Sequence, residues 1–472
     1  MKKLICCFLV LLLALSAVAC SGGQSKDTTD ETTVTTQKAE VATTQKAEVA
    51  TTQKAEPAQK VKLTFLDMFQ VREQLNYVGY YFNMLDEWLL AHPNVEVDHQ
   101  GVADYNVFLE RRKAAFASND IPNMLWNTGA MDIQEFVKYD YILNLKPYFD
   151  ADKEWYNMFV ESFFSGCKFP GDDGIYAVPF TGQIGGLYLN MKPLNDVGIT
   201  KKPATMEELT VALDALAKQG KVIPFALGGK SVDGVAAVIT SIITKMYGPN
   251  WVEDVYSGKA KYTDAIPVDA YKLIKQFQDK GYFGKNFMEM DVTAQRNAYY
   301  NMDAAMTQAN GHIVAVTMDK SVAKDQIAYV AWPYFEKYPQ FEETYLAGVG
   351  DHFSVTNVGT KEAQDLTVDF IKYITKVDNF QKNAEIQAYA LMPIVKGIKV
   401  PAELPPMVKD FQDSLIKMKN SNRPATHDAF GAQAREIMLA NLSNFLYGDI
   451  TAEDALKNTQ VAIEKALADM NK

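Results

Sequence analysis

Residues 173–192 read DGIYAVPFTGQIGGLYLNMK, in which the apolar runs Ile175–Val178 and Leu187–Leu189 flank a proline and three glycines. Glycine tolerates backbone dihedrals that other residues avoid, and proline removes one hydrogen-bond donor from a sheet. In the middle of a long chain, such a stretch is either a phosphate-binding loop or a joint between two parts. The choice between these interpretations decides the fold and the function.

The glycine-rich segments of this region lack the spacing that phosphate binding requires. The sequence GGKS at 228–231 has the ending of a nucleotide-binding loop, but Pro224 stands at the position of that loop's first glycine. Proline has no backbone amide to offer a phosphate. The glycines within 182–186 do not have the spacing of a dinucleotide-binding loop. Such a loop also leads into a helix, whereas a strand is expected after these glycines. The sequence therefore favours the joint.

The chain before the joint alternates between strand and helix patterns. Two segments alternate apolar and polar side chains, as half-buried strands do, and two others have apolar residues at helical spacing. This order predicts an open, mainly parallel α/β sheet. The expected elements are strands at 61–65, 95–97 and 124–126 and helices over 81–89, ended by Pro93, and over 108–116.

The same alternation continues after the joint. Thr205 and Glu208 form a capping-box pattern that opens a helix, and Gly220 ends it. Because both sides of the joint have their own strands and helices, the chain is expected to form two lobes. The other expected elements are strands at 223–227, 327–330 and 345–349, a helix around 366–374, and a last helix capped by Thr451.

The N-terminus has the features of an exported, lipid-anchored protein. Residues 1–19 combine two lysines, an apolar stretch and small residues, as a signal peptide does, and Ala17-Val18-Ala19-Cys20 resembles a lipobox. Cys20 would then carry the lipid, including palmitate, and hold the protein on the outer side of a cell membrane. Residues 35–58 repeat the octad TTQKAEVA, with proline in the third copy, so residues 20–60 are expected to be a disordered tether.

Charge and cysteine content exclude several classes of protein. The formal net charge of −11 makes nucleic acid an unsuitable partner. Of the four cysteines, only Cys167 lies in the part expected to fold, so no internal disulfide can form there. Its apolar neighbourhood predicts a small buried side chain.

The sequence contains only fragments of known catalytic and metal-binding motifs. Ser-x-x-Lys occurs at Ser165, Ser321 and Ser414 without the other motifs of penicillin-interacting enzymes, and the five histidines lack metal-ligand spacing. We therefore expect no enzyme, no metal and no cofactor. Two alternatives stay open: an exported glycosidase acting through carboxylates such as Asp351, and a ligand-sensing partner of a membrane kinase.

Several segments, in their order along the chain, resemble the extracellular solute-binding proteins of sugar ABC importers, the family that contains maltose-binding protein. The resemblance covers about residues 60 to 472 and departs from the family pattern at Asn123, Met206 and His312, which replace aspartate, tryptophan and tryptophan. The matching segments are WLLAHPNV (88–95), DIPN (120–123), GIYAVP (174–179), LYLN (187–190), PATMEEL (203–209) and DAAM (303–306) through Gly311.

This resemblance implies a two-lobed periplasmic-binding-protein-like fold with hinge crossings, the first at 179–187, and a ligand cleft between the lobes. It implies a monomer that captures a carbohydrate by hinge closure and delivers it to the transmembrane subunits of a permease. One lobe is expected at 61–181 plus about 347–395, and the other at about 182–346 plus 396–472.

Ligand contacts are expected at the carboxyl ends of the strands, where open parallel sheets bind their ligands. A tryptophan there can stack on a sugar ring, while amides, hydroxyls and carboxylates take the sugar hydroxyls. The family positions of sugar contacts suggest Gln183 and His312. The full expected set is Trp126, Asn127, Thr128, Asp132, Gln183, Lys230, Ser231, Asp233, His312, Asp351 and His352.

Overall fold

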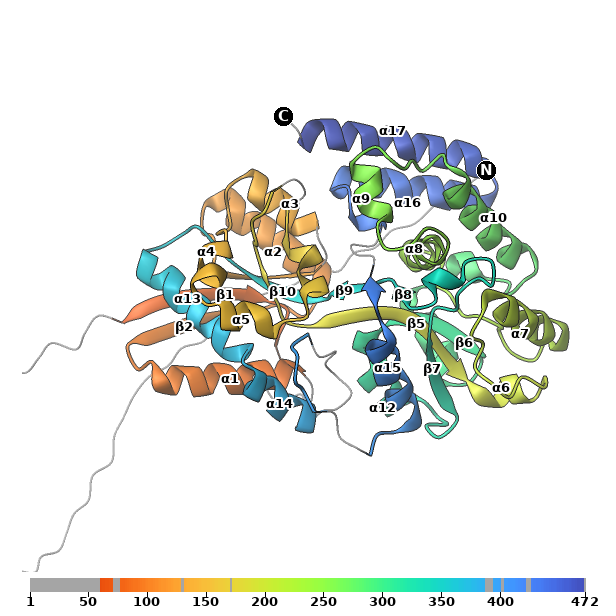
Figure 1. Ribbon diagram of the computed structural model, residues 1–472, viewed down its shortest axis with the longest axis horizontal. Coiled ribbons are helices and arrows are strands. Elements are labelled where there is room, and N and C mark those ends of the chain that lie inside the picture. The colour runs from red at the N-terminus through yellow and green to blue at the C-terminus, as the bar shows by residue number, and fades with distance from the viewer. Residues whose placement is uncertain are drawn as a thin grey trace, which may run out of the picture. The chain divides into compact units, whose positions relative to one another are not determined.

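The structure of the protein is a computed structural model that describes residues 60–70, 77–128, 131–169, 172–386, 394–399, 403–421 and 426–470 (Figure 1). The expected signal peptide, Cys20 and the tether up to residue 59 lie outside the described residues. Within the described ranges, no helix combines the length and the apolar character that crossing a bilayer requires.

The first sheet has five strands in the order β2-β1-β3-β10-β4. Strand β1 pairs in parallel with β2 on one side and with β3 on the other, as the sequence pattern predicted. Strand β10 then pairs antiparallel with both β3 and β4. The segment of β10 comes from far along the chain, so the first sheet is completed by residues that follow the second sheet.

The second sheet is built around the long strand β5, which leads away from the first sheet in Figure 1. Strands β6 and β7 flank its second half, and β9 pairs with its beginning. A separate parallel pair joins β8 to β11. Strand β9 pairs with β5 and β10 pairs with β3, so the chain passes between the two sheets at Gly350. The lobe boundary expected at about residue 347 stays a prediction.

The two-lobed α/β fold class is confirmed, but the expectation of mainly parallel sheets is wrong: β5 is antiparallel to all three of its partners. The connections give the physical reason. The chain passes from the first sheet to the second through β4 and β5, and it returns through β9 and β10. Two crossings that run side by side in opposite senses must pair antiparallel, which accounts for β5 with β9 and for β4 with β10.

The glycines of the crossing provide space. None of Gly182, Gly185 and Gly186 has a positive φ. A Cβ on Gly186 would lie 2.2 Å from the hydroxyl of Tyr329 and 2.4 Å from its Cζ, whereas a Cβ on Gly185 would meet nothing nearer than 3.5 Å. The expected reason for these glycines was their backbone freedom. At Gly186 the reason is different, because the missing side chain leaves room for the Tyr329 ring.

Side chains of β5 point alternately to two cores. Leu187 and Leu189 pack into a cluster that contains Trp251 and Trp332, whereas Tyr188 belongs to the cluster that surrounds the first sheet. Alternation along a strand places successive residues on opposite faces. This one strand therefore joins both hydrophobic cores of the molecule.

The helix signals of the sequence are confirmed in detail. The Thr205 side chain accepts from the Glu208 amide at 3.1 Å, and the Glu208 carboxylate accepts from the Thr205 amide, which completes the capping box of α7. Gly220 ends this helix with a φ of 68°. Thr451 accepts from the amide of Asp454 at the start of α17.

Two expected strands are modified. Residues 223–227 form only isolated bridges at Ile223 and Ala226, because Pro224 between them has no amide to donate. The expected strand 345–349 is divided at Leu346, where pairing changes from β11 to β5.

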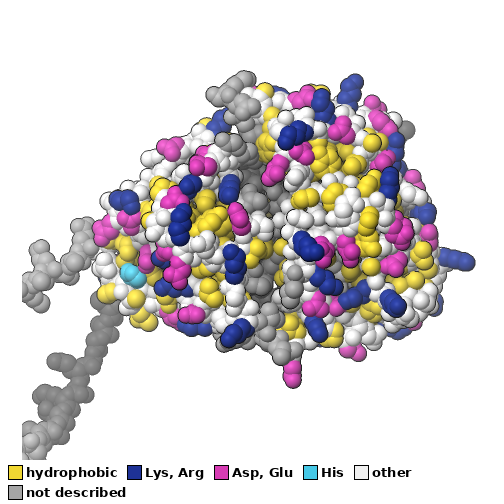
Figure 2. Space-filling model, viewed as in Figure 1, with side chains coloured by type: hydrophobic (Ala, Val, Ile, Leu, Met, Phe, Trp, Pro, Cys, Tyr) yellow, Lys and Arg dark blue, Asp and Glu magenta, His cyan; other side chains and the backbone are white. Residues whose placement is uncertain are grey.

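Cys167 is buried and is not in a disulfide, and burial raises the pKa of its thiol. On the face in Figure 2, acidic and basic side chains are interspersed over the described surface.

The strands are β1 (Val61–Asp67), β2 (Val95–Gly101), β3 (Met124–Thr128), β4 (Val178–Pro179), β5 (Gly182–Asn190), β6 (Met306–Asn310), β7 (Ile327–Ala331), β8 (Thr344–Tyr345), β9 (Ala347–Val349), β10 (Asp351–Val355) and β11 (Asn420–Ser421). The α-helices are α1 (Tyr77–Ala91), α2 (Tyr105–Ser118), α3 (Met131–Lys138), α4 (Lys146–Ala151), α5 (Lys153–Met158), α6 (Met191–Asn195), α7 (Met206–Gln219), α8 (Asp233–Tyr247), α9 (Trp251–Tyr256), α10 (Ala265–Asp279), α11 (Val292–Tyr300), α12 (Val314–Lys320), α13 (Lys361–Ile374), α14 (Val377–Ile386), α15 (Pro406–Lys417), α16 (Ala432–Tyr447) and α17 (Ala452–Met470). The 3-10 helices are η1 (Glu161–Cys167), η2 (Phe287–Glu289), η3 (Gly311–Ile313), η4 (Pro339–Phe341) and η5 (Thr426–Asp428).

Candidate functional site

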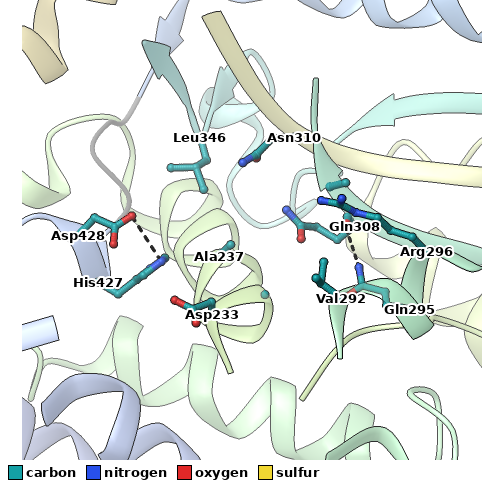
Figure 3. Close-up of a pocket in the computed structure, with 12 residues that line it drawn as sticks. Asp233, Ala237, Val292, Gln295, Arg296, Gln308, Asn310, Leu346, His427 and Asp428 are labelled. Atoms are coloured by element: carbon teal, nitrogen blue, oxygen red, sulfur yellow. Dashed lines mark hydrogen bonds and ion pairs between the residues drawn. The ribbon is translucent and has the colours of Figure 1, made fainter. Parts of the chain in front are cut away.

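A cavity of about 220 Å³ lies where α8 and α11 begin and β6 and η5 end (Figure 3). Its lining combines carboxylate, guanidinium, imidazole and amide groups with a few aliphatic side chains. Concave sites with a small number of convergent polar groups are the usual form of a small-molecule site. The lining residues are Asp233, Gly234, Ala237, Val292, Gln295, Arg296, Gln308, Ala309, Asn310, Leu346, His427 and Asp428.

The α8 wall is formed by a sharp entry into the helix. Val232 precedes α8 with a left-handed φ of 52°, and Asp233 follows as the first helical residue. An acidic side chain at this position is favoured by the helix dipole. The preceding loop packs closely, since a Cβ on Gly229 would lie 2.7 Å from the Phe287 ring. The Asp233 carboxylate is therefore placed at the cavity by a constrained turn.

Gln295 connects the α11 wall to two other segments. Its Oε1 accepts from the amide of Gly228 at 2.7 Å, and its Nε2 donates to the Thr307 hydroxyl at 2.9 Å and the Gln308 carbonyl at 3.0 Å. Three hydrogen bonds on one buried amide fix its orientation. Gln308, which is only 6% exposed, is thereby presented to the cavity from a rigid strand.

Asn310 ends β6 and connects the cavity to the crossing. Its Nδ2 donates to Oε1 of Gln183 on β5 at 3.1 Å. Its Oδ1 is buried and has no hydrogen-bond partner among the described residues. A buried acceptor without a donor costs free energy unless something binds to it, so Asn310 is a candidate ligand contact.

The η5 wall holds an imidazole next to a carboxylate. His427 Nε2 lies 3.6 Å from Asp428 Oδ2, and Figure 3 shows the pair facing the cavity from one side. His427 is only 7% exposed, and its Nδ1 has no partner within the described ranges. This wall therefore offers a second unused hydrogen-bonding atom.

The structure places some of the expected site residues at this cavity. Asp233 lines the cavity. Gln183 does not line it but accepts a hydrogen bond from Asn310, which does. Lys230 and Ser231 lie in the exposed turn before α8 and do not line it. Asp132 falls in α3 and His312 in η3, and their side chains lie outside the described part of the structure.

The remaining expected residues meet along the β3–β10 pair. Asp351 is in register with Thr128, and His352 with Asn127. Asn127 and His352 have no exposed surface, and Asn127 Nδ2 donates to the Ser354 hydroxyl at 3.0 Å. Trp126 is 6% exposed and packs edge-on against Phe108 with ring centroids 5.3 Å apart. These five residues lie on two paired strands, and their contact with a ligand stays a prediction.

Several cavity residues escaped the sequence analysis. Gln308 and Asn310 alternate at the end of a strand, directly before Gly311, and this pattern could have suggested them. His427 and Asp428 have no comparable signal, because only the fold brings them to α8. The lining residues that were missed are Gly234, Ala237, Val292, Gln295, Arg296, Gln308, Ala309, Asn310, Leu346, His427 and Asp428. Among the described side chains, no three His, Cys, Asp or Glu residues are grouped as a metal site.

Comparisons with known proteins agree with this architecture. A chitin oligosaccharide binding protein has a TM-score of 0.75 and 25% identity, with 87% of this chain and 100% of that chain covered. A structure from work on xylan utilization by the thermophilic bacterium Caldanaerobius polysaccharolyticus has a TM-score of 0.71 and 22% identity, covering 85% and 99% of the two chains. The maltose-bound MalE3 of T. maritima has a TM-score of 0.68 and 18% identity, covering 86% and 99%.

The family comparison covers most of the described chain. The model of the bacterial extracellular solute-binding proteins matches residues 80–379, which include the β4–β5 and β9–β10 crossings and most of the cavity. Members of this family bind solutes and do not transform them, so the glycosidase alternative built on Asp351 is not supported. The protein belongs to the bacterial extracellular solute-binding proteins.

Proposed function

We propose that the protein is the carbohydrate-binding component of an ABC importer and that one sugar unit of its ligand occupies the cavity between α8, α11, β6 and η5. The position of the unpartnered Asn310 Oδ1 at the cavity is the observation that carries this assignment, because a ligand can reach it there, whereas the equally unpartnered Oδ1 of Asn127 lines no part of this cavity. Sugar hydroxyls are such donors. The similar structures that are associated with chitin oligosaccharide, xylan and maltose support a carbohydrate ligand.

The cavity's chemistry suits a sugar held by its edge. Gln308, Asn310 and Asp233 offer oxygen acceptors to hydroxyl groups, whereas Ala237 and Leu346 offer aliphatic surface to C–H groups. No aromatic side chain is among the described residues that line this cavity. Stacking of a sugar on Trp126 stays a prediction, since Trp126 does not line this cavity and packs against Phe108.

Capture of the ligand would use the crossings. A ligand that binds the closed arrangement better than the open one shifts the population toward closure by its difference in affinity. Asn310, bonded to Gln183 on β5, lies between the cavity and the first crossing. The closed protein would then deliver its ligand to the transmembrane subunits of the permease.

The N-terminal segment would keep the receptor near its permease. The sequence of residues 1–19 is that of an exported protein, and Cys20 would carry the lipid that anchors the chain outside the cytoplasm. The repeated octads would separate the folded part from the membrane surface, and a monomer is expected.

Calorimetric titration with chitotriose, xylotriose and maltotriose tests the proposal. We expect at least one of these sugars to bind with a dissociation constant in the micromolar range, roughly −8 kcal/mol. The Asn310→Ala variant should bind that sugar more weakly, and the surface variant Lys272→Gln serves as the matched control. Heat and fluorescence responses that stay flat for every sugar would contradict the carbohydrate assignment.

A further inference from the structure

Arg435 links two walls of the cavity without lining it. Its Nη2 donates to Oδ1 of Asp233 on α8, and its Nε donates to Oδ1 of Asp428 on η5 at 3.0 Å. Arg435 is not one of the residues that line the cavity, whereas both carboxylates are. The guanidinium therefore stands behind the carboxylates and ties α8, η5 and α16 together at one point.

Arg435 places a positive charge near the N-terminus of α16, where the helix dipole disfavours it. It lies near the start of α16, which follows Gly431 and has no acidic residue in its first turn. A cation near a helix N-terminus is disfavoured by the helix dipole. The two carboxylates compensate for this cost, so the tertiary contact and not the helix explains an arginine here.

Arg435 keeps its charge in this environment. Partial burial acts to lower its pKa, but the charges of Asp233 and Asp428 outweigh burial and raise the pKa overall. An arginine bridges two carboxylates with separate N–H groups of a rigid planar fork, which the single ammonium of lysine does not reproduce. The bridge therefore holds the two carboxylates in fixed orientations.

The bridge also balances the charge around the cavity. Asp233 and Asp428 contribute two negative charges, and Arg435 behind them and Arg296 on the lining contribute two positive ones. A ligand with a net charge would disturb this balance, because the four charges lie on or directly beside the lining. An uncharged ligand with many hydroxyl donors would not, because the outward carboxylate oxygens can accept from it.

We propose that Arg435 is a positioning residue that fixes Asp233 and Asp428 as paired acceptors and makes the cavity selective for an uncharged sugar unit. This inference rests on the proposed function of the same cavity. It differs from that proposal in naming how the acceptors are held and which charge state of the ligand they select.

Titration of the wild type, Arg435→Gln, Arg435→Lys and the control Lys272→Gln with chitotriose, xylotriose and maltotriose tests this role. Lys272 forms a surface ion pair with Glu453 at 2.7 Å, away from the cavity. For the sugar that binds, Arg435→Gln should weaken binding by about tenfold or more, because two carboxylates lose their charged donor. Arg435→Lys should recover part of the loss, and Lys272→Gln should match the wild type.

Two readouts separate positioning from general structural damage. In Arg435→Gln the charged groups at the cavity become net negative. The ratio of the affinity for a cationic amino-deoxy analogue to the affinity for the neutral sugar should therefore be at least about fivefold higher in this variant than in the wild type. The double variant Arg435→Gln with Asp233→Asn should lose less affinity than the product of the two single losses, because arginine acts through that carboxylate. Thermal unfolding of each variant establishes that it is folded before titration.

The possible results are distinguishable. If the wild type binds none of the sugars, the proposed function fails and the inference fails with it. If the wild type binds and Arg435→Gln binds equally well, the role of Arg435 alone is overturned. An equal loss for the neutral and cationic sugars in Arg435→Gln would overturn the charge selection.

Discussion

The ends of β3 and β6 have the same kind of sequence and different surroundings. Each is a five-residue strand with an asparagine at or next to its carboxyl end, Asn127 in β3 (MLWNT) and Asn310 in β6 (MTQAN). Asn127 is fully buried between its own strand and β10, and its amide donates to Ser354. The Oδ1 of each asparagine is buried and has no partner among the described residues, but only Asn310 lines the cavity.

The difference teaches that a polar residue at a strand end becomes a binding group only when its neighbours leave room for a ligand. At β3 the neighbouring strand β10 is in register with the last residues, and its side chains fill the space. At β6 the next segment turns into η3, while α8 and η5 approach from other parts of the chain and leave a hollow. Packing, not residue type, separates the two asparagines.

The largest expected effect tests whether the β3 end is packed as core. Trp126→Ala should lower the free energy of unfolding by about 3–5 kcal/mol, because it removes a large side chain that is 6% exposed. Val292→Ala at the cavity, where the side chain is 50% exposed, should change it by less than about 1 kcal/mol. Denaturant unfolding measures both, and similar losses for the two variants would break the comparison.

A second prediction concerns the strand that joins the two regions. Gly186→Ala should destabilise the protein by about 1–3 kcal/mol, because the new Cβ would overlap the buried Tyr329 ring. Gly185→Ala, one residue earlier, should have a much smaller effect, since its Cβ has only ordinary contacts. The pair is compared by thermal unfolding, and an equal loss at both positions would show that backbone freedom matters more than space.

The two asparagines can be exchanged for alanine directly. Asn127→Ala should cost about 1–2 kcal/mol of unfolding free energy, because the Ser354 hydroxyl loses a buried partner. Asn310→Ala should weaken binding of the sugar by about tenfold, or roughly 1.4 kcal/mol, with a smaller change in stability. Calorimetry and denaturant unfolding of both variants give the four values. The opposite pattern, with binding lost at Asn127, would move the site to the β3 end.

The smallest expected effect, about 1 kcal/mol per pH unit, comes from a cation buried in the helix that begins at the cavity. Lys245 of α8 is 1% exposed, donates to the carbonyls of Phe341 and Glu342, and lies over the Tyr345 ring at 4.0 Å. Burial lowers its pKa from 10.5 to about 7, although the Glu342 charge acts in the opposite direction.

The sign of the pH dependence follows from proton binding. Between pH 7 and 10.5 the unfolded chain binds more protons at Lys245 than the folded chain, so the free energy of unfolding should rise with pH across this window. Below pH 7 the cost of the buried charge is fully present. Urea unfolding at pH 7 and pH 9 measures this. Between these values, the free energy of unfolding of the wild type should rise by about 1 kcal/mol per pH unit relative to that of Lys245→Met. Parallel pH profiles of the two proteins would contradict the buried charge.

Local signals determined much of the secondary structure. The capping box at Thr205 and Glu208, the stop at Gly220 and the alternation at 61–65 depend on contacts within a few residues, so the sequence could predict them. The order of such segments also indicated two lobes and a family of solute-binding proteins, which the comparisons confirm. Residues after strand ends could be selected as candidates by the same local logic.

Only the tertiary structure decided which candidates share a cavity and in which direction the strands pair. β5 is antiparallel to β9 because two crossings run side by side in opposite senses, and no local pattern specifies that. Asp233, Asp428 and Arg435 are separated by long stretches of chain, and their contact exists only because α8, η5 and α16 pack together. Local backbone preferences act over a few residues, whereas the shape and charge of a cavity depend on side chains that meet only after the whole chain has folded.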